Sequence, residues 1–315
     1  MNNISLILVS FITIMMTCCY SCEIEKSPFL FQETDQGIGL SENGKPVFVY
    51  QRKPKSPAGQ NFFSNYIHPL FSLKGDTLTE EFPPDHLNHR GIFWAWHQLY
   101  VDSVNIGSGW INDNITVDVI DLKTQNKNTQ VRINIEAIWK SSEFCDGKPF
   151  MNEHTIIIVH QLESDIRKID FEIRLKPLVE GFLIGGSSDE KGYGGFCTRI
   201  KLPDNLIFTS ENGQVTPQLL QINSGPWMDF SGDFGQDSVI SGLTILCHPD
   251  NPDYPAPWIL RQKGSMQNVV FPGQNKISIP MDNPVVLRYR LIIHNGNAVS
   301  LNIPGLQSEY EKMDF

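Results

Sequence analysis

The chain has 315 residues and a formal net charge of −10, with 24 glycines and 20 prolines. A surface this acidic argues against nucleic acid as a partner, because it repels the phosphate backbone. It leaves room for a neutral ligand such as a sugar. The length suffices for one large hydrophobic core, and no internal repeat or low-complexity tract divides the chain.

Residues 1–22 are uncharged and mostly apolar, and they end in Ser21-Cys22. This pattern predicts an export signal, in which a small residue before a cysteine marks the cleavage and lipidation site of a bacterial lipoprotein. We expect Cys22 to carry the lipid, and cleavage at Cys18 or Cys19 stays open. No later segment holds eighteen successive apolar residues, so the lipid anchor alone is expected to attach the protein to a membrane. The predicted location is the cell envelope, on the outer membrane and facing either the periplasm or the outside.

A short tether is predicted over residues 23–36, and alternation of apolar and polar residues dominates the chain after it. Ile169 and Phe171, for example, are separated and followed by acidic residues, which is typical of a half-buried strand. The predicted strands are Lys45–Tyr50, Ile115–Leu122, Val131–Trp139, His154–Leu162, Ile169–Lys176, Leu206–Thr209, Leu243–Cys247, Lys276–Ile279 and Val285–His294. Helical periodicity is confined to a short turn near Gln307–Lys312.

The predicted fold is therefore all-β with very little helix: a single domain over residues 37–315, built as a large antiparallel β-sandwich. Two sheets are expected to pack face to face, in the ordinary or the enlarged supersandwich form. Three cysteines remain after the signal, Cys145, Cys197 and Cys247. Their odd number and wide spacing do not make a disulfide framework, so we expect them to act as small hydrophobic residues.

The segment Phe82–His97 concentrates three histidines, an aspartate, an arginine and two tryptophans. Two prolines near its start disfavour a helix, so we expect a constrained turn followed by an aromatic strand. Titratable groups at this density on a loop favour a functional site. The candidate catalytic residues on the turn are Asp85, His86, His89 and Arg90. The alternative is a surface turn whose polar side chains cap their own backbone, followed by a core strand.

Four further blocks join aromatic, charged or imidazole side chains to glycine and proline. Their candidate residues are His68 before a proline, Lys191 and Tyr193 among glycines, Trp227 beside Asp229, and His248 ahead of Trp258. Flat aromatic faces next to planar hydrogen-bonding groups suit a sugar ring. The alternative for each block is a structural role, since tryptophans often cover the edge of a core. If the site prediction holds, the turn, His68, Lys191–Tyr193 and His248 converge on one pocket.

A metal site on the same residues stays open. His86 and His89, with Asp85 on the same turn and His68 from another block, offer nitrogen and oxygen ligands for a divalent ion. Their spacing lacks the helical geometry of zinc proteases, and no glutamate stands between the two histidines. No cofactor is therefore predicted, and a divalent metal is kept as an alternative.

Taken together, the blocks resemble a family of secreted bacterial proteins commonly labelled methane oxygenase PmoA, or PmoA-like. The matching blocks are Tyr66–Pro69, Pro83–Trp96, Lys191–Gly195 with Arg199, Trp227–Gly232 and His248–Trp258. The resemblance covers nearly all of the chain after the signal and adds Arg199 to the candidate binding residues. One departure is Leu87-Asn88, where the family pattern has Pro-His, so a mechanism that needs a third histidine there does not carry over.

The label itself does not imply a membrane-embedded monooxygenase, because that subunit spans the membrane several times and this sequence predicts no span after its signal. The resemblance implies a carbohydrate substrate instead, through the sugar-catabolic proteins that accompany the family. This expectation agrees with the one drawn from the aromatic and imidazole blocks.

The favoured hypothesis is a lipid-anchored, carbohydrate-active enzyme that cleaves or rearranges a glycoside by histidine-based acid–base chemistry. The expected catalytic residues are His68, Asp85, His86, His89, Arg90 and Lys191, and the expected binding residues are Tyr193, Arg199, Trp227, Asp229, His248 and Trp258. Ordinary glycosidases need two carboxylates beside the scissile bond, and Asp85 with Asp229 is the single such pair in the blocks. Proton abstraction therefore stands beside hydrolysis. Two other hypotheses remain: a sugar-binding lipoprotein without activity, and the metal-dependent oxidoreductase that the label suggests.

Overall fold

A computed structural model describes residues 27–235 and 239–313. The predicted signal over residues 1–22 and the lipidation site Cys22 lie outside these described residues. None of the helices within them is long and apolar enough to cross a membrane.

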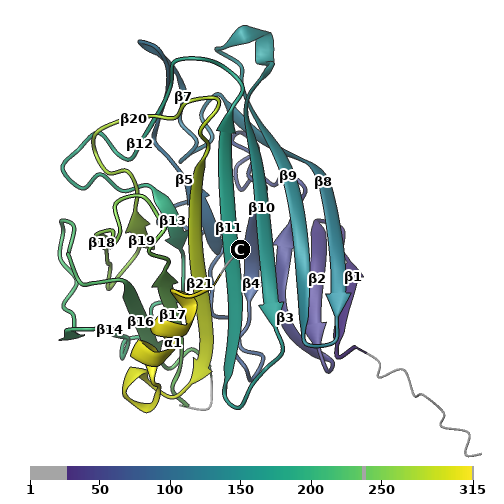
Figure 1. The fold of residues 1–315 in the computed structure, drawn as a ribbon, viewed down its shortest axis with the longest axis vertical. Helices are drawn as coiled ribbons and strands as arrows, with labels where there is room; N and C mark the ends of the chain where they lie inside the picture. The colour runs from purple at the N-terminus through teal and green to yellow at the C-terminus, as the bar shows by residue number, and fades with distance from the viewer. Residues whose placement is uncertain (1–26, 236–238, 314–315) are drawn as a thin grey trace, which may run out of the picture.

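The larger of two extended antiparallel sheets has nine strands. Their order is β15 (Gly213–Gln214), β14 (Ile207–Ser210), β16 (Trp227–Gly232), β17 (Ser241–Cys247), β21 (Val285–Asn295), β11 (Ile166–Pro177), β10 (Pro149–His160), β9 (Gln130–Ser141) and β8 (Ile115–Lys127). Figure 1 shows the long strands of this sheet side by side as one tall layer. Neighbouring strands pair antiparallel throughout, as the alternating sequence predicts.

The second extended sheet has eight strands. Their order is β1 (Phe29–Glu33), β2 (Gly37–Glu42), β3 (Lys45–Gln51), β4 (Tyr66–Leu70), β5 (Ile92–Ala95), β13 (Gly195–Thr198), β19 (Gln267–Val270) and β18 (Trp258–Ile259). A third, smaller sheet contains β20 (Ile277–Ser278), β12 (Phe182–Gly185), β6 (Gln98–Val101) and β7 (Val104–Gly107), and lies at one end of the sandwich (Figure 1).

Helix is limited to η1 (Cys145–Gly147), η2 (Ala298–Ser300) and α1 (Ile303–Tyr310) within the described residues. The all-β prediction with very little helix is confirmed, and so is the sandwich, with the four-strand sheet added to the two expected layers. The helical turn predicted near Gln307–Lys312 corresponds to α1, which begins four residues earlier because Asn302 caps it and a proline stands in its first turn.

The two extended sheets face each other across one hydrophobic core. Phe171 of β11 packs its ring against Trp94 of β5 and Phe196 of β13, with ring centroids 6.5 Å and 5.4 Å apart. Along β9 every second residue is buried, which is the alternation that the sequence predicts for a strand with one face on a core. Full burial of one such side chain contributes about 1.5–3 kcal/mol, so this interface dominates the stability of the sandwich.

The tether predicted over residues 23–36 is wrong for residues 29–33. These form β1, which pairs with β2 at the edge of the eight-stranded sheet. Phe29 is buried in the core and Phe31 packs against it. A five-residue edge strand presents two apolar positions on its core face, too few for alternation to stand out in the sequence.

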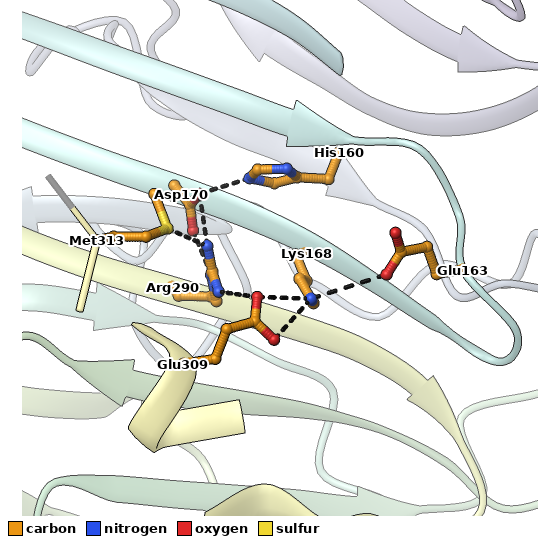
Figure 2. A network of polar contacts seen from close by, with 7 residues as sticks. All are labelled: His160, Glu163, Lys168, Asp170, Arg290, Glu309 and Met313. Carbon is orange, nitrogen blue, oxygen red and sulfur yellow. Dashed lines mark hydrogen bonds and ion pairs between the residues drawn. The ribbon is translucent and has the colours of Figure 1, made fainter. Parts of the chain in front are cut away.

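A buried ion pair joins the two strands at the centre of the outer face of the nine-stranded sheet. The Arg290 guanidinium of β21 donates to both carboxylate oxygens of Asp170 on β11, and each side chain is 1% exposed. Glu309 of α1 accepts from Lys168 at 2.8 Å and lies 3.5 Å from Arg290. Figure 2 shows how this network reaches from the sheet to the helix. It fixes α1 over the outer face, which carries buried apolar residues beside it.

Burial alone would raise the pKa of Asp170, but hydrogen bonds from His160 and Arg290 outweigh burial and hold the pKa below its usual value. A carboxyl group whose folded pKa is depressed contributes stability above its unfolded pKa. That contribution is lost as the pH falls through the folded pKa. The network therefore belongs to the neutral-pH structure of the sheet.

Replacing Asp170 by Asn leaves the Arg290 charge buried without its carboxylate. We expect the free energy of unfolding to fall by about 3–5 kcal/mol, because an unpaired buried charge is costly. Denaturant unfolding at neutral pH, followed by tryptophan fluorescence, measures this change. As a control, Asp121→Asn removes an exposed carboxylate paired with Lys123 and should leave the midpoint nearly unchanged. Equal shifts in the two variants would contradict the role assigned to Asp170.

Candidate functional site

The segment that the sequence singles out forms the predicted tight turn. The His86 amide donates to the Pro83 carbonyl at 2.9 Å, and the His89 amide donates to the His86 carbonyl at 3.0 Å. The turn leads directly into β5, the predicted aromatic strand. Gly91 closes its base with a φ of +47°, and a Cβ added there would lie 1.8 Å from the Ile67 carbonyl oxygen. Only glycine fits this close approach between the turn and β4.

An ion pair holds the turn on the eight-stranded sheet. Arg199, which follows β13 and is 3% exposed, donates from two guanidinium nitrogens to the two carboxylate oxygens of Asp85, each at 3.0 Å. Its third contact is with Glu80 at 2.8 Å. The bidentate geometry fixes the orientation of the Asp85 carboxylate as well as its position. Arg199 therefore acts as a positioning residue in this site.

The same carboxylate orients His86. The Nδ1 atom of His86 lies 3.0 Å from Oδ2 of Asp85. Burial would raise the pKa of Asp85, but the hydrogen bonds from His86 and Arg199 lower it further than burial raises it, so Asp85 is ionised at neutral pH. An ionised Asp85 holds the proton of a neutral His86 on Nδ1. The lone pair is then on Nε2, where it can accept a proton.

A cavity of about 300 Å³ opens beside this dyad. Its lining comes from the turn, the glycine-rich block and the loop after β18, and comprises His86, His89, Trp110, Lys191, Tyr193, Leu219, Ile259, Arg261, Lys263, Gly264, Ser265 and Met266. The structure thus brings together four residues that the sequence proposes from two separate blocks: His86, His89, Lys191 and Tyr193. Asp85 and Arg199 do not line the cavity, but they hold the turn and His86 in place.

His89 lies stacked on His86, with ring centroids 4.4 Å apart and ring planes within 1°. It is 2% exposed, and its Nδ1 has no hydrogen-bond partner among the described residues. Burial, with a smaller contribution from the charge of Arg199, lowers the pKa of His89 to about 3. At neutral pH His89 is therefore an uncharged ring. It can form hydrogen bonds, but it is not an imidazolium that could act as a general acid.

Three aromatic rings pack together beside the cavity, and two of them, Trp110 and Tyr193, line it. His97 stacks on Trp110 with centroids 4.8 Å apart, and Tyr193 packs edge-on against both rings. Burial lowers the pKa of His97 to about 4, so this ring is also neutral at neutral pH. The cluster fixes Tyr193, whose phenol is half-buried beside the dyad.

Arg90 does not reach the cavity, so the charge-stabilising role predicted for it is wrong. Its guanidinium lies 4.6 Å from the ring centroids of Phe63 and Phe93 and 5.8 Å from that of Tyr66. Burial lowers its pKa to about 10, which still leaves it charged at neutral pH. The aromatic cage holds this charge under the turn by cation–π contacts.

The prediction that His68 and His248 converge on the same pocket is wrong. His68 on β4 packs at the base of the turn, where its Nδ1 contacts the Thr79 hydroxyl at 3.0 Å, and it does not line the cavity. His248 lies at the end of β17, with its ring against Tyr310 of α1. Both histidines precede a proline and contact neighbouring side chains, which agrees with the structural role given above as the alternative.

The stacking and carboxylate roles predicted for Trp227, Asp229 and Trp258 are also wrong. Trp258 is 0% exposed in the main core and Trp227 is 6% exposed in the cluster under α1. Asp229 is fully buried on the outer face, where it accepts from Thr244 at 2.7 Å and contacts His294 at 2.8 Å. It therefore forms no catalytic pair with Asp85.

The candidate metal ligands do not fit an ion. Because the rings of His86 and His89 are parallel, the in-plane lone pairs of their nitrogens do not meet at one point. His86 Nδ1 is engaged by Asp85, and His68 Nδ1 by Thr79. Across residues 27–235 and 239–313, no group of three or more His, Cys, Asp or Glu side chains is placed to hold a metal.

Eight of the twelve lining residues are absent from the sequence prediction, and three of these eight, Trp110, Arg261 and Lys263, carry an aromatic ring or a charge. Trp110 follows Gly107-Ser-Gly109, a glycine-rich turn of the kind that marks the other blocks, so that signal could have found it. Arg261 and Lys263 lie in the loop after β18, which carries no histidine or aromatic residue to draw attention to it. Their place in the cavity follows from strand order alone, because β19 pairs with β13.

The fold and site define an all-β sandwich protein with a histidine-lined, cation-rich cavity on the outer face of the eight-stranded sheet. The chain belongs to a family of unknown function, DUF6807, whose sequence profile matches residues 38–306. A search of curated proteins found no match. The description of the family carries no mention of PmoA.

The lowered pKa of His89 predicts that the stability of the protein falls in acid. The unfolded chain takes up a proton at this histidine near pH 6.5, whereas the folded chain does so only near pH 3, so stability contributed by the neutral ring is lost as the pH falls below about 6.5. Unfolding free energies measured between pH 7 and pH 4 should decline, and His89→Gln should reduce that slope by up to about 1.4 kcal/mol per pH unit. His154→Gln, at a ring 32% exposed, is the control. The same slope in wild type and His89→Gln would show that His89 titrates normally.

Proposed function

We propose that this protein is a carbohydrate-active enzyme that cleaves or rearranges a glycoside, with His86 as the general base. The observation that carries the proposal is the imidazole of His86, held by Asp85 at one nitrogen and lining a cavity with Lys191 and Tyr193. Enzymes that remove a proton from a bound substrate commonly use a base that a carboxylate orients, with a proton donor and a cation nearby.

Tyr193 supplies the proton donor. Burial raises the pKa of its phenol, so the hydroxyl keeps its proton at neutral pH. Lys191 pairs with Asp189 at 3.0 Å and lines the same cavity, where its charge can stabilise negative charge that develops on the substrate. Base, acid and cation thus come from the turn and the glycine-rich block.

The lining favours proton abstraction over ordinary hydrolysis. Both usual classes of glycosidase place two carboxyl groups on either side of the scissile bond. Among the residues that line the cavity there is no Asp or Glu, and the nearby Asp85 is already engaged by Arg199. A lyase-type cleavage needs one base and one acid, and the site offers both.

A second cavity of about 230 Å³ is lined by other residues of the same turn. On the turn, His86 and His89 line the first cavity, whereas Leu87 and Asn88 line the second. In the same way, Trp110 lines the first cavity and its neighbour Ile111 lines the second. Each of these two chain segments therefore contributes residues to both cavities. This arrangement suits a ligand with two linked parts, one on each side of the bond that breaks.

The resemblance to PmoA-like proteins supports a sugar ligand, through the sugar-catabolic proteins that accompany that family. The oxidoreductase that the label suggests is not supported, because the candidate ligands do not fit a metal ion. A sugar-binding lipoprotein without activity is the second candidate, since aromatic rings in the cavity wall, with neutral imidazoles, would also bind a sugar ring.

Removing the base should lower turnover and leave binding largely intact. We expect His86→Ala and Asp85→Asn to lower kcat by about 10²–10⁴-fold with little change in sugar affinity, because general base help acts on the transition state. Tyr193→Phe should lower kcat by a similar factor if the phenol donates the proton. The measurement is a screen of glycosides and oxidised glycosides that reads product release and affinity in parallel.

His154→Ala, at a histidine on β10 outside the cavity, is the matched control and should keep full activity. Turnover that survives both His86→Ala and His89→Ala would show that other residues move the proton. Sugar binding without turnover by the wild type, across a broad panel, would favour the binding protein.

We further propose that the enzyme is a lipid-anchored protein of the cell envelope, on the strength of the apolar start and the Ser21-Cys22 junction. The Cys22→Ser variant should move from the membrane fraction to the soluble fraction, because acyl chains would supply the anchoring free energy. Fractionation followed by immunoblotting tests this. A variant that stays with the membranes would overturn the assignment of Cys22.

A further inference from the structure

The cavity carries a charge opposite to that of the protein. The chain has a net charge of −10, yet the titratable side chains of fixed charge that line the cavity are Lys191, Arg261 and Lys263, without a carboxylate among the lining residues. Side chains of one sign in a cavity with low-dielectric walls focus their potential on whatever enters. A neutral sugar can accept hydrogen bonds from these side chains, but only an anionic ligand also gains from their charge.

Arg261 shows that the charge is built in and left uncompensated. Its two terminal nitrogens donate to three backbone carbonyls at 2.7–2.9 Å, which hold the guanidinium in place. Neither Arg261 nor Lys263 forms an ion pair with a carboxylate of the described residues, whereas Lys191 is balanced by Asp189. Two positive charges without a carboxylate partner among the described residues therefore lie on one loop of the cavity wall, Arg261 held by carbonyl groups and Lys263 exposed.

The imidazoles add a second observation that points to a ligand. His89 is 2% exposed, lines the cavity and leaves its Nδ1 without a partner among the described residues. A buried polar atom left unsatisfied in a native fold calls for a ligand or a water molecule. His89 therefore adds an uncharged imidazole with an unpartnered, buried nitrogen to the wall of the cavity, beside the fixed charges of Arg261 and Lys263.

We infer that the ligand is a glycan whose sugar ring bears a carboxylate, a uronic acid residue, and that the reaction is β-elimination. This inference rests on the proposed function and names its substrate class. The carboxylate faces Arg261 and Lys263. The same group makes the hydrogen on the adjacent ring carbon acidic enough for an imidazole base.

The step balances without water, oxidant or reductant. His86 Nε2 takes the proton from the ring carbon next to the carboxylate, and the electron pair left behind forms a double bond to the next ring carbon. The bond from that carbon to the glycosidic oxygen breaks, and the Tyr193 hydroxyl protonates the leaving oxygen. The proton on His86 then passes to the tyrosinate. Arg261 and Lys263 stabilise the charge that builds on the carboxylate during proton abstraction.

The test compares an oligosaccharide of uronic acid residues with its methyl ester and with a sulfated neutral oligosaccharide, by calorimetric titration. The wild type should bind the uronate about tenfold more tightly than the ester, because an ionic hydrogen bond is lost on esterification. Lys263→Gln should remove that preference, and Lys263→Arg should keep it. Lys45→Gln, which makes the same charge change on exposed β3, should have no effect.

Reaction products give an independent readout. Elimination yields an unsaturated sugar that absorbs in the ultraviolet and incorporates no oxygen from solvent water, whereas hydrolysis incorporates one. We expect the first outcome, with the rate falling in Lys263→Gln and surviving in Lys45→Gln. Equal affinity for uronate and ester, or tighter binding of the sulfated sugar, would overturn the inference.

The two proposals fail in different ways. Turnover of neutral glycosides without preference for a uronate would overturn the uronate inference and leave the acid–base enzyme standing. Absence of both binding and turnover with every sugar in the panel would overturn the proposed function and the inference with it.

Discussion

The bidentate ion pair between Arg199 and Asp85 fixes the turn on which the candidate site depends. Arg199 follows a strand of the eight-stranded sheet, and Asp85 lies on the turn ahead of β5, so the pair ties a loop to the rigid layer beside it. The carboxylate that receives the guanidinium also receives His86. One buried arginine therefore sets the position of the turn, the orientation of the imidazole and the tautomer that it adopts.

The Asp85 carboxylate is engaged in positioning the turn and His86, and this limits the chemistry that the site can support. Asp85 is ionised and fully engaged, so it is not free to act as a nucleophile or as an acid. His89 is kept neutral by burial, so it presents no positive charge to the cavity that it lines. What remains is one oriented base, one protonated phenol and the cations of the loop after β18. This set fits proton abstraction better than attack by water between two carboxylates.

The architecture and four of the twelve residues that line the cavity could be predicted from the sequence, for separate physical reasons. Alternation reports which residues of a strand face a core, so the long strands and the all-β class could be predicted. The turn around His86 could be predicted because prolines and titratable residues are local signals. Trp227 and Trp258 could not be placed, because a tryptophan in a strand has the same sequence appearance whether its face is open or covered. Here α1 covers one and the core encloses the other.

Arg261 and Lys263 illustrate the remaining limit. They reach the cavity because β19 pairs with β13, and β13 pairs with β5, which places three distant segments of chain in neighbouring strands. Pairing between strands so far apart in sequence leaves no local trace in composition or periodicity. Yet these two residues give the cavity its charge, and its charge is what separates an anionic ligand from a neutral one. The proposed base therefore comes from the histidines that stand out in the sequence, while the proposed choice of an anionic ligand rests on a loop that carries no such signal.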